Sequence, residues 1–173
     1  MAFNIARFLE KVLLKGVPSK VEGMTGVTQE ITTDSATVIT GDELIRTKDK
    51  VKDAFQNSAV WVMHSDTRTA VRLLKDGNER YLFQDDVNSS FGGLLLGKPV
   101  YVSDQMDTIA AGKTPIFYGD LSGLAVKVSE DINIKVLTEK YAEEHALGVL
   151  GFVEMDSKVE NAQKLSKLTM KTA

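Results

Sequence analysis

The segment of this chain that most resembles a nucleotide-binding site is Ala111-Gly112-Lys113-Thr114. A phosphate-binding loop that ends in Gly-Lys-Thr needs another glycine five residues earlier, so that successive backbone N–H groups can wrap a phosphate. Asp107 stands at that position and adds negative charge where the phosphate would lie. We therefore predict a turn between two strands. Phe91-Gly92-Gly93 is predicted to be a loop, because the third glycine and the following helix of a dinucleotide-binding motif are missing.

Metal or acid–base chemistry would have to come from two histidines and scattered carboxylates. His64 and His145 are the only histidines, and neither belongs to a His-x-x-x-His or His-Glu-x-x-His pattern. We interpret His64 as a helix-cap or turn residue. His145 lies beside Glu143 and Glu144, and nothing in the sequence marks it as a catalytic base.

Two acidic pairs carry oxygen atoms of the kind that divalent cations prefer. They are Asp85-Asp86 and Asp104 with Asp107. Solvated loop carboxylates are the favoured interpretation of both pairs, and no serine stands in a Gly-x-Ser-x-Gly elbow. The sequence therefore nominates no catalytic, cofactor-binding or metal-binding residue and implies no cofactor.

The composition is that of an ordinary globular protein. The chain has 173 residues, of which 43% are hydrophobic and 26% are charged, and its formal net charge is −3. The negative balance argues against strong generic nucleic-acid binding, which needs a basic surface. With no cysteine there is no disulfide framework. No apolar run approaches the roughly 20 residues that span a bilayer, so we expect no membrane partner.

The stretch from Ser58 to Gly119 is predicted to form the centre of the fold. Ala59-Val60-Trp61-Val62-Met63 is an unbroken apolar run, which suits a strand buried on both faces. A helix follows, with Ser65 as its N-cap. The apolar stripe of this helix is expected at Ala70, Val71, Leu73 and Leu74, and its end at Asp76-Gly77-Asn78. Two strands are expected after it, at Lys98–Val102 and Pro115–Tyr118.

Two more helices are predicted in the first 60 residues. The first carries an apolar stripe at Ile5, Phe8, Leu9, Val12 and Leu13 and ends at Lys15-Gly16 before Pro18. The second opens at a capping box formed by Thr40 and Glu43. It is expected to point Leu44, Ile45, Val51, Ala54 and Phe55 inward and Arg46, Lys48, Asp49, Lys50 and Lys52 outward.

Strands dominate the prediction after Gly123. Leu124–Val128 and Ile132–Val136 alternate apolar and polar residues, as half-buried antiparallel strands do. Ala146–Met155 and Leu165–Met170 are predicted to be further strands. Asp156–Gln163 is left without an assignment.

Several of these segments together resemble the major capsid protein of tailed bacteriophages over roughly Phe3 to Lys171. The order of the segments and their spacing carry the resemblance, since each alone is common. The matching segments are Trp61-Val62-Met63-His64, Leu73-Leu74-Lys75-Asp76-Gly77-Asn78-Glu79-Arg80-Tyr81-Leu82-Phe83, Leu95-Leu96-Gly97-Lys98-Pro99-Val100 and Ile116-Phe117-Tyr118-Gly119-Asp120-Leu121-Ser122. Glu22-Gly23-Met24 resembles the turn that follows the family's long helix.

The resemblance implies an α+β fold of two lobes. Residues 29–122 would form an axial lobe, a central sheet flanked by helices. Residues 1–28 and 123–173 would form a discontinuous peripheral lobe, a helix lying on long antiparallel strands.

The same resemblance implies a structural rather than an enzymatic role. The chain would be a subunit of the icosahedral shell of a tailed phage or prophage, assembled in the bacterial cytoplasm and located in the virion. Its partners would be copies of itself in pentameric and hexameric rings, with scaffolding or other capsid proteins as further candidates and packaged DNA only indirectly involved. The alternatives are an encapsulin-like cargo shell and a small metal-dependent hydrolase that uses Asp85, Asp86, Asp104 or His64.

The apolar stripe of the first helix is already running at Phe3, with no capping residue before it. A frayed terminus and a chain that starts inside a longer helix both explain this. On the second interpretation the family's N-terminal arm and extended loop precede this chain. Because some family members crosslink through a lysine of that loop and a peripheral asparagine, and Glu144–Leu147 holds no asparagine, we expect no self-crosslinking.

Without arm and loop, the chain alone is expected to be monomeric or to form small rings rather than closed shells. Light scattering measures this directly, and megadalton particles from the purified chain would contradict it.

Overall fold

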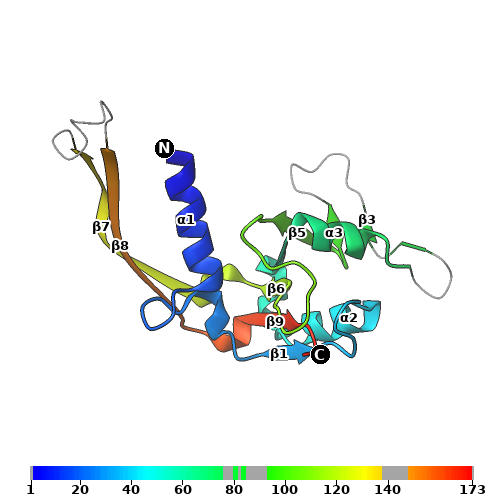
Figure 1. Cartoon of the computed structure of the whole chain (residues 1–173). Coiled ribbons are helices and arrows are strands. Elements are labelled where there is room, and N and C mark those ends of the chain that lie inside the picture. The colour runs from blue at the N-terminus through cyan, green and yellow to red at the C-terminus, as the bar shows by residue number, and fades with distance from the viewer. Residues whose placement is uncertain (1, 76–79, 82, 85–92, 138–147, 173) are drawn as a thin grey trace.

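The structure, a computed structural model, describes residues 2–75, 80–81, 83–84, 93–137 and 148–172. Figure 1 shows a body built on a sheet, with α1 and a ribbon of two long strands standing at one side of it. The helices and strands are α1 (Ala2–Lys15), β1 (Glu30–Thr32), α2 (Gly41–Asp49), β2 (Val60–Met63), α3 (Ser65–Arg72), β3 (Phe83–Gln84), β4 (Leu94–Leu95), β5 (Lys98–Val102), β6 (Ile116–Gly119), β7 (Leu124–Leu137), β8 (Gly148–Val159) and β9 (Leu165–Thr169). Short 3-10 helices span Gly23–Gly26, Asp53–Ser58, Leu121–Gly123 and Ala162–Lys164.

The body contains a mixed sheet in the order β1-β9-β6-β2-β5-β4-β3. Strand β2 is central: Trp61 lies opposite Val100 of the parallel strand β5 and opposite Tyr118 of the antiparallel strand β6. The predicted strands at 59–63, 98–102 and 115–118 are thereby confirmed to within a residue. The ribbon β7–β8 is a separate two-stranded sheet, so the fold is α+β as predicted.

Both faces of the central sheet are buried, which explains the unbroken apolar run at its centre. Successive residues of a strand point to opposite faces. Trp61 and Tyr118 therefore lie in one core with residues of α2 and α3. Val62 and Phe117 lie in a second core, where Leu14 at the end of α1 packs on the other face.

The fully buried Trp61 joins three parts of the body. Its ring centroid lies 4.3 Å from that of Tyr118, and its Nε1 donates a hydrogen bond of 3.0 Å to the carbonyl oxygen of Leu95. The Tyr118 hydroxyl donates in turn to the side-chain oxygen of Gln56. Gln56 Nε2 donates to the carbonyl oxygens of Lys48 and Val51, at 2.8 and 2.9 Å.

These last two bonds explain why α2 is shorter than predicted. The helix ends at Asp49, Lys52 is extended, and a 3-10 helix follows. Gln56 satisfies carbonyl groups that a helix end leaves without an intrahelical partner. The expectation that Ile45 points inward is wrong: Ile45 is exposed, and the neighbouring Thr47 is buried instead.

The capping box predicted at the start of α2 is confirmed. One oxygen of Glu43 accepts from the backbone N–H of Thr40 at 2.7 Å, and the other accepts from that of Asp34 at 2.8 Å. Glu43 is a buried carboxylate, and these two bonds replace the water that burial removes.

Helix α3 differs from its prediction at both ends. Its N-cap is His64 rather than Ser65, because His64 Nδ1 accepts from the backbone N–H of Asp66 at 3.1 Å. The helix already ends at Arg72, so Leu73 falls off the buried stripe and is 68% exposed. The predicted stop at 76–78 lies outside the described residues.

Helix α1 ends as predicted at Lys15, followed by Gly16 with φ 66°. The chain then folds back onto the helix at Gly23, where a Cβ would lie 2.7 Å from the carbonyl oxygen of Leu13. This close approach places Met24 in the second core beside Leu14.

The strand predicted at Leu165–Met170 is confirmed as β9, but its place differs from the expectation. The sequence prediction grouped it with the long strands of the peripheral lobe. In the structure β9 lies in the central sheet between β1 and β6, with Leu168 opposite Ile31 and opposite Ile116. The chain therefore returns from the ribbon to the body before it ends.

Burial raises the pKa of Tyr118 to about 12, and the nearby charge of Asp49 adds to this. The unfolded phenol ionises near pH 10, so the native state holds the extra proton between pH 10 and 12. The free energy of unfolding should therefore fall as pH rises through that range. Tyr118→Phe should remove this component and, by leaving Gln56 without its donor, cost about 1 kcal/mol at pH 7.

Urea unfolding followed by the fluorescence of Trp61, at pH 8 to 11.5, measures both effects. Wild-type and Tyr118→Phe proteins with the same pH slope would contradict the assignment.

Candidate assembly surface

The structure places Ala111–Thr114 in the turn between β5 and β6, as predicted. The Gly112 N–H lies 3.2 and 3.3 Å from the carbonyl oxygens of Met170 and Lys171, and the Lys113 N–H donates to Ala110. These donors are already used within the chain. The segment therefore has the geometry of a turn that holds the C-terminal residues rather than of a phosphate cradle.

The candidate metal and acid–base residues do not form a site in the part of the chain that is described. His64 caps α3, and Asp104 lies 4.0 Å from Arg7 at the surface. Asp85, Asp86 and His145 lie outside the described residues. Among the described residues, no three His, Asp or Glu side chains gather closely enough to hold a metal ion.

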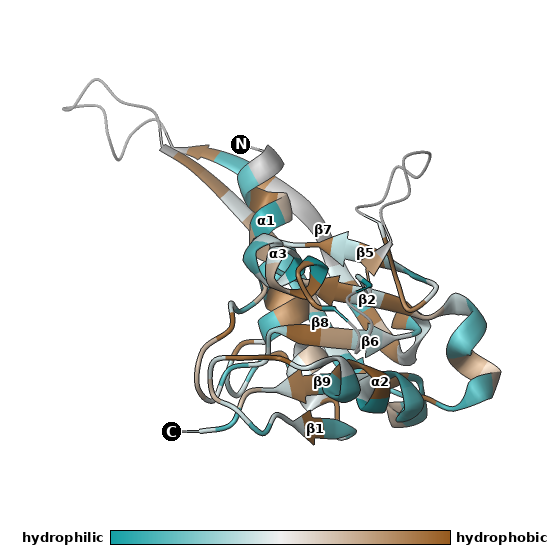
Figure 2. Ribbon diagram, turned by 90° about the vertical axis from the view of Figure 1, so that its right-hand side faces the viewer, coloured by the Kyte–Doolittle hydropathy of each residue, from teal (hydrophilic) through white to brown (hydrophobic). Residues whose placement is uncertain are grey.

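The ribbon β7–β8 carries one apolar face. Near the body Val128 lies opposite Met155, and toward the tip Ile134 and Val136 lie opposite Gly151 and Val149. Directly opposite residues of an antiparallel pair share a face. Figure 2 shows apolar residues along both strands of the ribbon.

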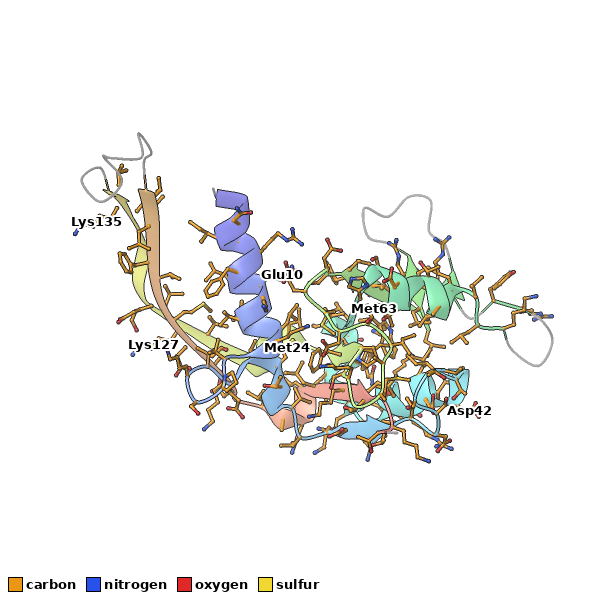
Figure 3. All side chains as sticks on the ribbon, viewed as in Figure 1. Glu10, Met24, Asp42, Met63, Lys127 and Lys135 are labelled. Carbon is orange, nitrogen blue, oxygen red and sulfur yellow. The ribbon has the colours of Figure 1, made fainter. Side chains whose placement is uncertain are left out.

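Near the body, the other face of the ribbon is charged. Lys127 lies opposite Asp156, and Lys158 lies opposite Ala125. Figure 3 shows Lys127 and Lys135 pointing away from α1. Toward the tip this face also carries the exposed residues Leu150 and Phe152. The two-sided pattern of a sheet with one face meant for burial is therefore clearest near the body.

The two strands predicted at 124–128 and 132–136 are one continuous strand with two irregularities. The register shifts once between Val128 and Glu130 and again between Glu130 and Asn133. Each shift gives β7 one residue more than β8, which is the geometry of a β-bulge. One shift reverses the face that later side chains occupy, and the second reverses it again. Val128 and Ile134 therefore stay on the same side.

Helix α1 stands beside the apolar face without filling the space against it. A Cβ on Gly151 would lie 3.4 Å from Ile5 Cδ1, so the helix comes close to the ribbon there. Two hollows of about 450 and 600 Å³ remain between α1 and β8, and Phe8 lines both. No helix in the described segments is long and apolar enough to cross a membrane.

The face is largely open in the single chain. Val128, Ile134 and Val136 are 55%, 53% and 56% exposed, and Phe8 of α1 is exposed beside them. Scattered exposed apolar residues are normal, whereas contiguous ones mark interaction sites. We call the exposed apolar residues on this face of β7 and β8, together with Phe8 of α1, the ribbon face: Phe8, Val126, Val128, Ile134, Val136 and Val149.

A further groove of about 570 Å³ lies on the other side of α1, against the central sheet, and includes Leu9, Leu13 and Tyr101. Lys15 Nζ lies 2.7 Å from Asp107 Oδ1 and holds the end of α1 beside the loop after β5. The end of α1 is therefore fixed to the body by an ion pair and by Leu14. The first half of the helix stands between the 450 Å³ hollow against β8 and the 570 Å³ groove against the central sheet.

Sequence reasoning found the alternation of the ribbon but not its exposure. The alternation at 124–136 predicts half-buried strands, and nothing in one sequence says whether the same chain or another covers such a face. Gly151 lies within the predicted strand Ala146–Met155, where a glycine signals a close approach of another group; that group, Ile5, is distant in sequence.

The chain matches the phage capsid family over residues 1–170. No curated protein sequence is a significant match to it. Among solved structures, the capsid of an empty GTA particle is similar, with a TM-score of 0.78 and 21% identity over 99% of this chain. A structure from Gordonia phage Cozz is similar, with a TM-score of 0.70 and 15% identity over 100% of this chain.

A holo encapsulin complex from Synechococcus elongatus is similar at a TM-score of 0.60 and 16% identity, over 96% of this chain and 61% of that one. The chain spans 64% of the length of the GTA capsid chain and 62% of the Gordonia phage chain. These likenesses show that the fold is the one predicted from the capsid motifs.

The contact between α1 and the ribbon can be tested at Gly151. Gly151→Ala should be tolerated, because its Cβ would make an ordinary contact with Ile5. Gly151→Leu should push the first turns of α1 away and increase hydrogen exchange of residues 2–9 by about tenfold. Hydrogen exchange followed by mass spectrometry measures this. In Gly151→Leu, the second change Ile5→Ala should restore protection, and equal exchange in both Gly151 variants would contradict the contact.

Proposed function

Because the chain belongs to the phage capsid family, we propose that it is a structural subunit of a viral capsid shell and that copies of it pack against one another through the ribbon face. The virion is then its location, and the bacterial cytoplasm is the place of assembly. Its partners are other copies in capsomer rings, and scaffolding proteins are further candidates.

The observation that carries this proposal is the open ribbon face. Apolar side chains that are more than half exposed on a projecting ribbon lose free energy when they leave water, by about 25 cal/mol per Å². The body already buries its own apolar residues in two cores. A second copy can supply the cover that the chain itself lacks, and a head-to-tail contact closes into a ring when the rotation fits.

The strand pairing supports a division into two lobes. The central lobe consists of residues 29–122, as expected from the sequence, together with β9. The peripheral lobe consists of residues 1–28 and the ribbon. In this arrangement the peripheral lobe carries the ribbon face, and the central lobe supplies the rigid body behind it.

The encapsulin-like alternative shares the fold, and the match to the phage capsid family favours the phage capsid over it. The hydrolase alternative has less support. Of its proposed residues, His64 serves as a helix cap, and Asp104 is exposed beside Arg7.

Charges on the ribbon face should weaken self-association. The double change Ile134→Glu with Val136→Glu puts two carboxylates where the proposal requires a dry contact. Burying an unpaired charge is costly, so we expect association to weaken by at least about a hundredfold. Both residues are more than half exposed in the single chain, so its own stability should change little.

Sedimentation of the purified chain over a range of concentrations measures the effect. Val38→Glu is the matched control, because Val38 is 56% exposed in the loop before α2 and lies away from the ribbon. The proposal expects species larger than a monomer for the wild type and for Val38→Glu. A wild type that stays monomeric at millimolar concentration, or a ribbon variant that associates like the wild type, would refute it.

A further inference from the structure

The chain leaves the central sheet for the ribbon and comes back through two turns that lie side by side. The outgoing turn, residues 120–123, connects β6 to β7, and the returning turn, residues 161–164, connects β8 to β9. We call these two turns the joint. The outgoing turn is the Gly-Asp-Leu-Ser segment that the sequence analysis singled out as a capsid motif.

The two turns are built alike. In the outgoing turn, Asp120 Oδ1 accepts from the backbone N–H of Ser122 at 2.9 Å. In the returning turn, Asn161 Oδ1 accepts from that of Gln163 at 3.0 Å. A side-chain oxygen that accepts from the backbone two residues later fixes the turn locally. Each turn is therefore rigid by itself.

Backbone hydrogen bonds join the turns to each other. The Asp120 N–H donates to the Lys164 carbonyl oxygen at 2.9 Å, and the Glu160 N–H donates to that of Gly123, also at 2.9 Å. The fit leaves no room for side chains at two positions. A Cβ on Gly119, whose φ is 138°, would collide with the Lys164 carbonyl oxygen, and one on Gly123 would lie 2.9 Å from Lys164 Cβ.

The side chain of Lys164 then spans the joint. Its Nζ donates to Ser122 Oγ at 2.8 Å, lies 3.8 Å from Asp120 Oδ2, and lies 5.4 Å from the ring centroid of Phe55. Phe55 packs against the core of the body. The ammonium group of Lys164, a residue of the returning turn, thus contacts two residues of the outgoing turn. It also lies near the ring of Phe55, which belongs to the body.

The charges support this arrangement. Burial raises the pKa of Asp120, but hydrogen bonds from Ser122 and the charge of Lys164 outweigh that effect and leave the pKa below its ordinary value. The carboxylate is therefore ionised at neutral pH. Both side chains are mostly shielded from solvent, with 22% and 17% exposed for Lys164 and Asp120, so screening by salt is weaker than at an open surface.

We propose that Lys164 is a positioning residue, which locks the two turns into one rigid joint and so fixes the direction in which the ribbon leaves the sheet. The consequence for assembly rests on the proposed function. The direction of the ribbon sets the angle at which the ribbon face meets a second copy, so the joint restricts the range of ring sizes that can form.

The direction of the ribbon can be measured on the single chain. The chain contains no cysteine, so spin labels at Lys50→Cys on the body and Lys135→Cys on the ribbon are the only two. Pulsed dipolar spectroscopy at low concentration then gives the distribution of distances between them. In Lys164→Met, which keeps a long unbranched side chain but removes the charge and donors, the width of that distribution should grow about twofold.

Two further variants separate positioning from general stability. Lys164→Arg keeps a cation and donors and should restore the narrow distribution. Lys167→Met removes another ion-paired lysine, 3.5 Å from Glu30 Oε2 in the central sheet, and should leave the width unchanged. The emission of Trp61 should be the same in all three proteins. An unchanged width in Lys164→Met, or equal broadening in Lys167→Met, would overturn the proposal.

Negative-stain microscopy of the associated chain tests the consequence for assembly. Wild type, Lys164→Arg and Lys167→Met should give only rings of five and six copies, and Lys164→Met a broader range of sizes. The same two sizes in Lys164→Met would refute restriction by the joint while leaving the proposed function intact. A wild type that never associates would refute the proposed function, and the spectroscopic result would still decide whether Lys164 positions the ribbon.

Discussion

The rest of the structure depends on the burial of Trp61 between strands β5 and β6. Its indole N–H is satisfied by Leu95, and its ring rests on Tyr118, whose hydroxyl reaches Gln56. A buried indole or phenol without a partner would cost free energy, so this chain of bonds is what permits two large aromatic residues at the centre of a small body. Gln56 in turn donates a hydrogen bond to the Lys48 carbonyl oxygen near the end of α2, which ties that helix to the aromatic pair. One aromatic pair thus holds three elements in register.

The body and the ribbon differ in how their apolar side chains are covered. In the body, alternate side chains of β2 and β6 enter two cores, and both are closed by helices and turns of the same chain. In the ribbon, alternate side chains gather on one face that α1 approaches at Gly151 and leaves largely open. The first arrangement makes a stable unit, and the second leaves free energy to be gained from a neighbour. The role proposed for this chain, packing against copies of itself, requires both a stable body and an uncovered apolar face.

The sequence was most informative where burial is decided within a few residues. The run at Ala59–Met63 predicted a strand buried on both sides, and Thr40 with Glu43 predicted the start of α2, because both signals are local. It failed at Leu73, which lies beyond the end of α3, and at Ile45, which lies inside α2 but off the face that buries Leu44 and Thr47. The end of a helix and the face that it buries are decided by distant partners: Gln56 satisfies carbonyl groups at the end of α2, and no sequence periodicity indicates that. The alternation of residues in the ribbon predicts that it has an apolar face, but it does not indicate which molecule covers that face.

The paired irregularities of β7 restrict how this strand can change length. One extra residue lies between Val128 and Glu130 and another between Glu130 and Asn133, and their effects on side-chain direction cancel. Because Ile134 lies opposite Gly151, its face is set by that partner and not by the number of residues that separate it from Val128. Deleting one extra residue together with its irregularity would therefore leave Ile134 and Val136 on the side of α1 and would only straighten the strand there. The irregularities are the places where β7 can gain or lose a single residue without exchanging its apolar and charged sides.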